Sequence, residues 1–164
     1  MQYASTKIYK STCIMQVNYF FYFCSMSNQK RKSDCPINFA LELFGDRWSF
    51  LIIRDMMFKG KHAYGAFLQS EEKIATNILA DRLSLLEKSE IIIKSPDPTH
   101  GSKFIYKLTQ KGIDLLPVLI EVIMWSSKYD NNTTTDMEFV NRVNRDREGL
   151  INELSDNLTK ELTQ

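Results

Sequence analysis

The sequence predicts a mainly α-helical domain with a small β-hairpin wing, an α+β fold. Three observations support this class. Apolar residues recur at three- and four-residue steps over most of the chain from residue 36 onward. One stretch, residues 91–108, instead holds a β-branched run and an alternating run on either side of a turn-rich loop. The length of 164 residues leaves room for one ordinary globular domain and little else.

Composition and charge exclude several classes of protein. Hydrophobic residues make up 43% and charged residues 25%, which excludes a disordered chain, a fibrous repeat and a polytopic membrane protein. The net charge of +1 argues against a polycation, although a local basic face fits within it. Three cysteines, an odd number, argue against a secreted disulfide scaffold. We therefore expect a soluble, cytoplasmic protein without a membrane partner.

The first part of the chain differs from the rest. Its apolar run, Ile14 to Cys24, is shorter than the roughly 18 residues that a membrane helix needs. Basic residues precede this run as in a signal peptide, but no small-x-small cleavage site follows it. Residues 26–32 are typical of a protein start. We therefore expect residues 1–33 to be an N-terminal extension, poorly ordered or a start-site artefact.

Four helices are expected before the hairpin. Gly45 is suited to end the first, and Asp46 is suited to cap the second. The second helix has apolar residues on two faces, with Trp48 among them, so it is predicted to be the buried centre of the domain. The fourth leaves small and polar side chains on one face, which permits close approach to a partner surface. The expected ranges are 36–44, 47–58, 64–69 and 75–88.

The hairpin and the chain after it complete the expected fold. The strands are residues 91–93 and 104–108. Thr109 is suited to cap a further helix, in which Pro117 is predicted to cause a kink. Residues 137–162 are predicted to form one helix, whose apolar seam needs a partner surface. We expect residues 34–130 to form one domain, and residues 131–164 to supply a linker and a helix for dimerisation. The expected dimer interface combines the first helix with the helices after the hairpin, including residues 137–162.

The residues give little support for an enzyme. The six glycines are scattered, so a phosphate loop and a dinucleotide fingerprint are both lacking. His62 and His100 are not spaced from another His or Cys as metal ligands are. We therefore expect no catalytic residues, no metal site and no cofactor.

The order of helices and hairpin is instead the layout of a winged helix-turn-helix. Its fourth helix would fit the major groove of DNA, and its hairpin would lie along the phosphates. From periodicity alone, a surface helix with a solvated hairpin edge explains the pattern equally well.

A resemblance decides between these interpretations. The segments that carry it are Cys35-Pro36, residues 45–54 (GDRWSFLIIR), Phe67, residues 74–83 (IATNILADRL) with Leu86-Glu87, residues 106–112 (YKLTQKG) and residues 116–119 (LPVL). With these segments, residues 35–125 resemble the HxlR family of bacterial winged-helix transcription regulators, and the resemblance implies a homodimer that binds a pseudo-palindromic operator. Two positions depart from the family pattern. Glu90 stands where the family usually has a glycine in a left-handed turn, and Asp81 places an acid on the presumed DNA side.

The resemblance makes the fourth helix the recognition helix. Thr76 and Asn77, in its first turns, are the expected base readers. Arg82 is the expected phosphate contact, and the alternative is a surface ion pair with Asp81 or Glu87. Lys103 and Lys107 are the expected wing contacts, and the alternative is a pair of solvated lysines. The full set of expected DNA-binding residues is Thr76, Asn77, Ala80, Arg82, Ser84, Lys103 and Lys107.

Cys35 has two interpretations. Some members of the family sense oxidants or electrophiles through a cysteine at this Cys-Pro position, so the resemblance implies a redox switch and an oxidant or small-molecule inducer. A cysteine near a helix N-terminus also has a stabilised thiolate. The alternative is a structural cysteine at the dimer interface. Cys13 and Cys24 are resolving partners only if the extension takes part.

The sequence therefore predicts a DNA-binding transcriptional regulator, either a repressor or an activator. Two other classes remain open. A thiol redox protein requires turnover of a peroxide or disulfide, yet the chain has no CxxC pair. A protein-interaction winged helix requires a protein partner on the face of residues 76–84.

Overall fold

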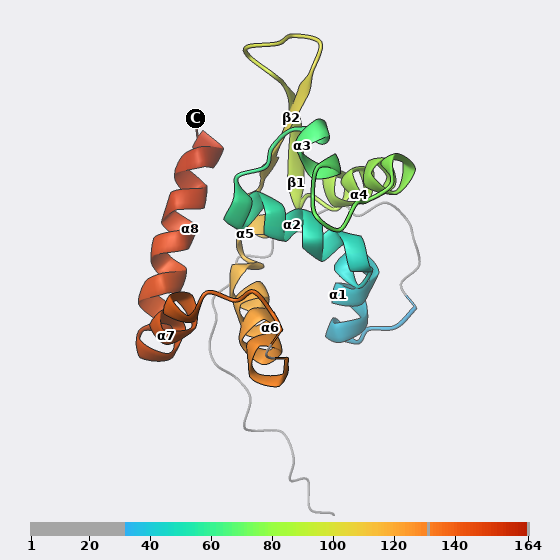
Figure 1. The fold of residues 1–164 in the computed structure, drawn as a ribbon. Coiled ribbons are helices and arrows are strands. Elements are labelled where there is room, and N and C mark those ends of the chain that lie inside the picture. The colour runs from blue at the N-terminus through green and yellow to red at the C-terminus, as the bar shows by residue number, and fades with distance from the viewer. Residues whose placement is uncertain (1–31, 131, 164) are drawn as a thin grey trace, which may run out of the picture.

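The computed structural model describes residues 32–130 and 132–163. A helical body carries one hairpin that projects from it (Figure 1). The predicted α+β class with a hairpin wing is confirmed. In chain order the elements are α1 (Pro36–Phe44), α2 (Arg47–Lys59), α3 (Tyr64–Leu68), α4 (Thr76–Lys88), β1 (Ile92–Pro96), β2 (Phe104–Leu108), α5 (Gln110–Ile113), α6 (Leu116–Tyr129), α7 (Met137–Arg145) and α8 (Arg147–Thr163).

Helix α2 runs through the centre of the body, as its two apolar faces predicted (Figure 1). Asp46 caps it by accepting hydrogen bonds from the backbone N–H groups of Trp48 at 2.8 Å and Ser49 at 3.1 Å. Gly60 ends it in the left-handed conformation, with φ of 57°. Trp48 is only half-buried, because it lies in the first turn and packs on the edge of the core. Its packing against the core agrees with its predicted place in the central helix.

A left-handed turn joins α4 to the hairpin at Glu90. The φ angle of this residue is 58°, so the conformation inferred from the family's usual glycine is confirmed. A side chain in this conformation costs roughly 1 kcal/mol relative to glycine. Hydrogen bonds on either side hold the turn: the Ile91 N–H donates to Leu86 O at 2.9 Å, and Thr109 Oγ1 donates to Glu90 O at 2.6 Å.

The hairpin is antiparallel, with Ile92 opposite Leu108 and Lys94 opposite Tyr106. Successive side chains of β2 therefore point to opposite faces. Tyr106 and Leu108 are buried against the body. The intervening residues of β2, Ile105 and Lys107, lie on the other face and are half-buried.

The predicted kink at Pro117 is instead a break between two helices. Thr109 caps the short α5 by accepting from the Gly112 N–H at 3.2 Å. Proline lacks an N–H and therefore fits the first turn of a new helix, and Pro117 takes this position in α6. The sequence placed the proline inside one continuous helix, and the structure corrects this.

The predicted helix at 137–162 is likewise two helices, α7 and α8, separated at Asp146. The Asp146 side chain accepts from the Gly149 N–H at 3.0 Å, which favours a fresh start for α8. The two helices pack on each other, and α8 also packs on α5, α6 and β2 (Figure 1). Its seam residues Leu150 and Leu158 are buried by this same chain. The partner surface that the seam required is thus the body of its own domain.

Candidate nucleic-acid interface

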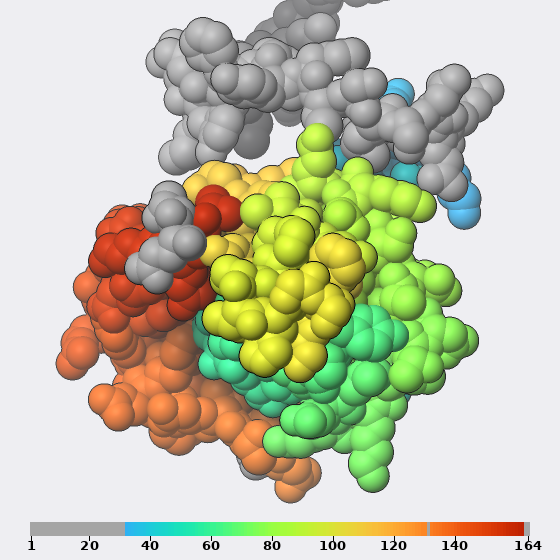
Figure 2. Space-filling model, turned by 90° about the horizontal axis from the view of Figure 1, so that it is seen from above, coloured from blue at the N-terminus to red at the C-terminus, as the bar shows by residue number. Residues whose placement is uncertain are grey.

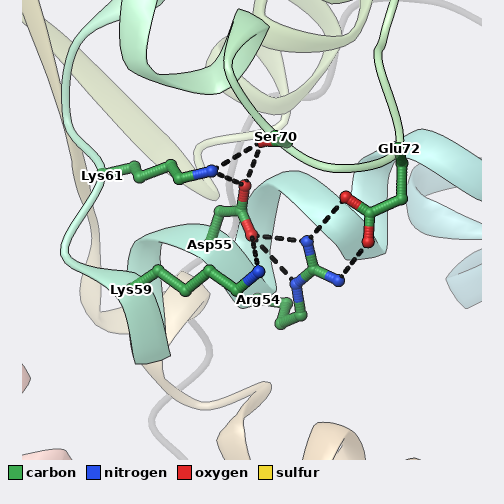
Figure 3. A network of polar contacts seen from close by, with 6 residues as sticks. All are labelled: Arg54, Asp55, Lys59, Lys61, Ser70 and Glu72. Carbon is green, nitrogen blue, oxygen red and sulfur yellow. Dashed lines mark hydrogen bonds and ion pairs between the residues drawn. The ribbon is translucent and has the colours of Figure 1, made fainter. Parts of the chain in front are cut away.

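A buried carboxylate in α2 fixes the turn between α3 and α4. Asp55 is 1% exposed. Its carboxylate accepts hydrogen bonds from Lys61 Nζ at 2.8 Å, from Ser70 Oγ at 2.5 Å and from Arg54 Nη2 at 2.6 Å (Figure 3). Arg54 Nη1 donates to Glu72 Oε1 at 2.6 Å. Because Ser70 and Glu72 lie in the turn, these contacts attach the helix-turn-helix to the central helix.

The same contacts keep both carboxylates charged. Burial raises the pKa of Asp55, but the hydrogen bonds from Lys61, Ser70 and Arg54 outweigh it and lower the pKa. The hydrogen bond from Arg54 lowers the pKa of Glu72 to about 2. A charge buried as deeply as that of Asp55 requires its partners, so the geometry of the turn depends on this network.

The first turn of α4 presents its side chains to solvent. Thr76, Asn77 and Ala80 are exposed, and Ser84 is half-buried on the same side of the helix. The hydroxyl of Tyr64, at the start of α3, donates to the Thr76 carbonyl oxygen at 2.7 Å. This bond ties the start of α4 to α3 while leaving the Thr76 and Asn77 side chains free to contact a partner.

A groove of about 780 Å³ separates α3 and α4 from the wing. Ala80 and Ser84 line its helical wall, and Lys94 and Lys103 line the wall formed by the wing. Lys94 Nζ lies 4.2 Å from the centroid of the Phe104 ring. Figure 2 looks down on the yellow hairpin, with the green residues of α3 and α4 on one side of it. A helix with small side chains thus lies beside a cationic strand, as binding in a groove of DNA requires.

Two acids also line this groove, Glu87 and Asp97. Asp97 is occupied within the wing loop, where it accepts from Thr99 Oγ1 at 2.7 Å and from the Thr99 N–H at 2.8 Å. These hydrogen bonds lower the pKa of Asp97. Its carboxylate therefore orders the loop that carries Lys103.

Arg82 lies on a different side of α4 from Thr76 and Asn77. Its Nη1 pairs with Asp46 Oδ2 at 3.2 Å, and its Nε is buried without a hydrogen-bond partner among the described residues. The expected alternatives to a phosphate contact were ion pairs with Asp81 or Glu87, and the acid found is Asp46 instead. The spacing along α4 explains this difference, because Arg82 stands beside the half-buried positions that face α2.

Lys103 and Lys107, the two expected wing contacts, line different clefts. Lys107 lines a second cleft, between the wing and α8, on the opposite face of the hairpin from Lys94. In Figure 2 the red end of α8 lies on one side of the hairpin and the green helices lie on the other. Lys107 lies within β2, on the face opposite Tyr106, whereas Lys103 precedes the strand, so the alternation of β2 does not extend to Lys103.

Comparison with known proteins agrees with this geometry. The sequence model of the HxlR-like helix-turn-helix family matches residues 43–134. This chain belongs to the HxlR-like helix-turn-helix family. It is 34% identical over 96 residues to the HTH-type transcriptional regulator YodB of Bacillus subtilis, covering 58% of this chain and 85% of YodB.

Two solved structures are similar to this chain in fold and sequence. The crystal structure of PA1607, a candidate transcription factor, is 34% identical with a TM-score of 0.58, and the match covers 65% of this chain and 74% of PA1607. The redox regulator HypR in its oxidized form is 26% identical with a TM-score of 0.52, covering 58% of this chain and 98% of HypR. Helices α7 and α8 begin after the region that the HxlR-like family model matches.

Cys35 occupies the N-cap of α1, directly before Pro36. Its side chain is exposed and forms no disulfide. Cys13 and Cys24, its candidate resolving partners, lie outside the described residues. Within the described ranges, no three His, Cys, Asp or Glu side chains gather as metal ligands. The described helices are all too short or too polar to cross a membrane.

Sequence reasoning missed Lys94 and Asp55. The hairpin register could have placed Lys94 in the groove, because a residue opposite Tyr106 lies on the same face of the hairpin as Tyr106. The predicted first strand, residues 91–93, stopped one residue short of it. Asp55 is an acid among buried apolar residues of α2, with Arg54 and Lys59 nearby. An acid in this setting is itself a sign of a buried ion-pair network.

Proposed function

We propose that this protein is a transcriptional regulator that binds double-stranded DNA as a homodimer and places α4 in the major groove. The observation that carries the proposal is the exposed first turn of α4, held by α2 and α3 beside the cationic wall of the wing. Family membership supports the same function. The proposal assigns the protein no chemical reaction and places it in the cytoplasm, where bacterial DNA lies.

Each contact in the proposal has a chemical role. Asn77 is suited to bond an adenine edge through both atoms of its amide, and Thr76 is suited to bond a neighbouring base. Ala80 and Ser84 are small enough for α4 to approach the base pairs closely. Lys94 and Lys103 are placed for phosphate contacts, which increase affinity without reading sequence.

The dimer surface in this proposal is formed by α1 and α6. Both helices project from the end of the body opposite the wing (Figure 1). Trp125 and Tyr129 are 66% and 64% exposed and stack with ring centroids 5.3 Å apart. Other large apolar side chains on these two helices are also exposed: Ile37, Leu41, Val118 and Val122. An exposed apolar surface of this extent is typical of an interface, and a second copy of the chain would cover it.

A dimer of this kind would place its two recognition helices at half-sites one helical turn apart, ~34 Å. A signal that changes the dimer interface would change this spacing, and thereby repress or activate a promoter. Cys35 lies in this region, at the N-cap of α1. An oxidant such as diamide would convert two Cys35 thiols, one from each chain, into a disulfide while the diamide is reduced to the hydrazine.

The proposal is tested by fluorescence anisotropy of the reduced full chain on duplex DNA from upstream of its own gene, with a scrambled duplex as control. We expect selective binding that persists when the salt concentration is raised. Equal affinity for both duplexes would contradict a role for this operator, and absence of binding at low salt would favour a protein-interaction module.

The dimer is tested separately by light scattering. Trp125→Glu should give a monomer and weaken operator binding. The matched control is Ile93→Glu, which introduces the same charge at an exposed apolar residue of the wing. Equal masses for Trp125→Glu and wild type would contradict the proposed surface.

A further inference from the structure

A second cleft, of about 350 Å³, lies between the wing and α8. This volume is at the lower end of the range of small-molecule sites. Apolar side chains form much of its wall: Met56 from α2, Ile105 from β2, and Leu158 and Leu162 from α8. Because α8 lies beyond the region matched by the family model, one wall of this cleft comes from outside that region.

One cation faces this apolar cleft without a counter-charge. Lys107 is half-buried, and its ammonium has no hydrogen bond or ion pair to any described residue. A partly desolvated ammonium of this kind favours an anionic partner. Glu161 also lines the cleft, but its side chain is 54% exposed, and its Oε2 lies 3.8 Å from His62 Nε2 and forms no ion pair with Lys107. The acid therefore remains in water at the rim.

We propose that this cleft binds a small molecule with an apolar body and one carboxylate. The carboxylate pairs with Lys107, and the apolar body packs between Ile105 and the two leucines of α8. Charge complementarity and the apolar lining are the grounds for this ligand class. A neutral molecule of the same shape would leave the charge of Lys107 unpaired.

The ligand would act on the DNA groove through β2, and this part of the inference rests on the proposed function. Ile105 and Lys107 face the cleft, whereas Phe104 and Tyr106, next to them in the same strand, line the groove beside α4. The backbone N–H of Tyr106 also donates to His62 O at 2.7 Å, so β2 is attached to the loop that precedes α3. Displacement of β2 by a ligand therefore changes the width of the α4 groove.

Calorimetric titration of the full chain with octanoate, without DNA, tests the site itself. We expect saturable binding of one octanoate per chain, and binding of octanamide that is at least about tenfold weaker. Lys107→Met keeps an unbranched side chain only one atom shorter and removes its charge, and it should weaken octanoate binding by a similar factor. Lys88→Met, an exposed lysine near the end of α4, is the matched control and should bind octanoate as wild type does.

Each outcome bears on the proposal. Absence of saturable binding at millimolar octanoate, or equal affinity of the wild type and Lys107→Met, would overturn the site. Repetition of the operator titration with saturating octanoate tests the coupling, and an unchanged affinity for DNA would overturn it. If the chain binds no DNA at all, the proposed function fails while the calorimetric result still decides whether the cleft is a site.

Discussion

Arg82 of α4 pairs with Asp46, the N-cap of α2, over 3.2 Å. The carboxylate of Asp46 thus serves two purposes: it caps α2 through Trp48 and Ser49, and it pairs with Arg82 in the middle of α4. Burial opposes the charge of Asp46, but the hydrogen bonds from Ser49, from the backbone and from Arg82 outweigh it and lower its pKa. The pair therefore links the middle of α4 to the start of α2.

Replacement of Arg82 should therefore affect stability rather than phosphate binding. Arg82→Gln is expected to lower the free energy of unfolding by about 1 kcal/mol or less, because the pair is partly exposed. The salt dependence of DNA binding should keep its slope. Urea unfolding and anisotropy at several salt concentrations measure the two effects. A smaller slope with unchanged stability would instead identify Arg82 as a phosphate contact.

The contact between Arg54 and Glu72 should make stability depend on pH. The pKa of Glu72 in the fold is about 2 against an ordinary value of 4.5, so its contribution is complete above pH 4.5 and is lost as the pH falls toward 2. Glu72→Gln should therefore unfold at lower urea than wild type at pH 7, and the difference should shrink below pH 4.5. A difference that is constant from pH 7 to pH 3 would contradict this account.

Glycine at position 90 should stabilise the fold. Glu90 has a φ of 58°, and glycine adopts this region without the penalty of a side chain. Glu90→Gly should raise the free energy of unfolding by up to about 1 kcal/mol, less any contact that the Glu90 side chain makes. The matched control is Glu71→Gly, outside helices and strands, which should not stabilise. Thermal unfolding measures both variants, and destabilisation of Glu90→Gly would contradict the prediction.

The two wing lysines should differ in their effect on DNA. Lys103 lines the groove beside α4, so Lys103→Met should weaken binding to all sequences alike and reduce the salt slope by about 1. Lys107 faces α8, and Lys107→Met should bind the operator as wild type does. Anisotropy on operator and scrambled duplexes measures both variants. Equal losses for the two would show that both faces of the wing contact DNA.

Local signals in the sequence predicted most of the fold. Asp46 and Thr109 start their helices by capping them, as their side chains predicted. The errors arose where two effects compete. Pro117 is compatible with a kink or with a new first turn, and only the packing of α5 against the body decides between them.

The site was predicted less completely, because it depends on which way side chains point relative to elements that are distant in the sequence. Thr76 and Asn77 lie on the exposed side of α4 because the apolar stripe of that helix faces the core. The partner of Arg82 lies 36 positions earlier in the chain, at Asp46, and helical spacing carries no information about it. Lys103 and Lys107 were both expected to be wing contacts, but Lys103 precedes β2 and lines the groove beside α4, whereas Lys107 lies in β2 and lines the cleft beside α8.

The central claim is that the first turn of α4 reads bases. Asn77→Ala tests it most directly, by anisotropy on the operator and on duplexes changed at one base pair at a time. The account predicts that wild type loses affinity at one adenine position by about 1–3 kcal/mol, and that the variant no longer distinguishes bases there. Retention of the full base preference by Asn77→Ala would contradict the placement of α4 in the major groove.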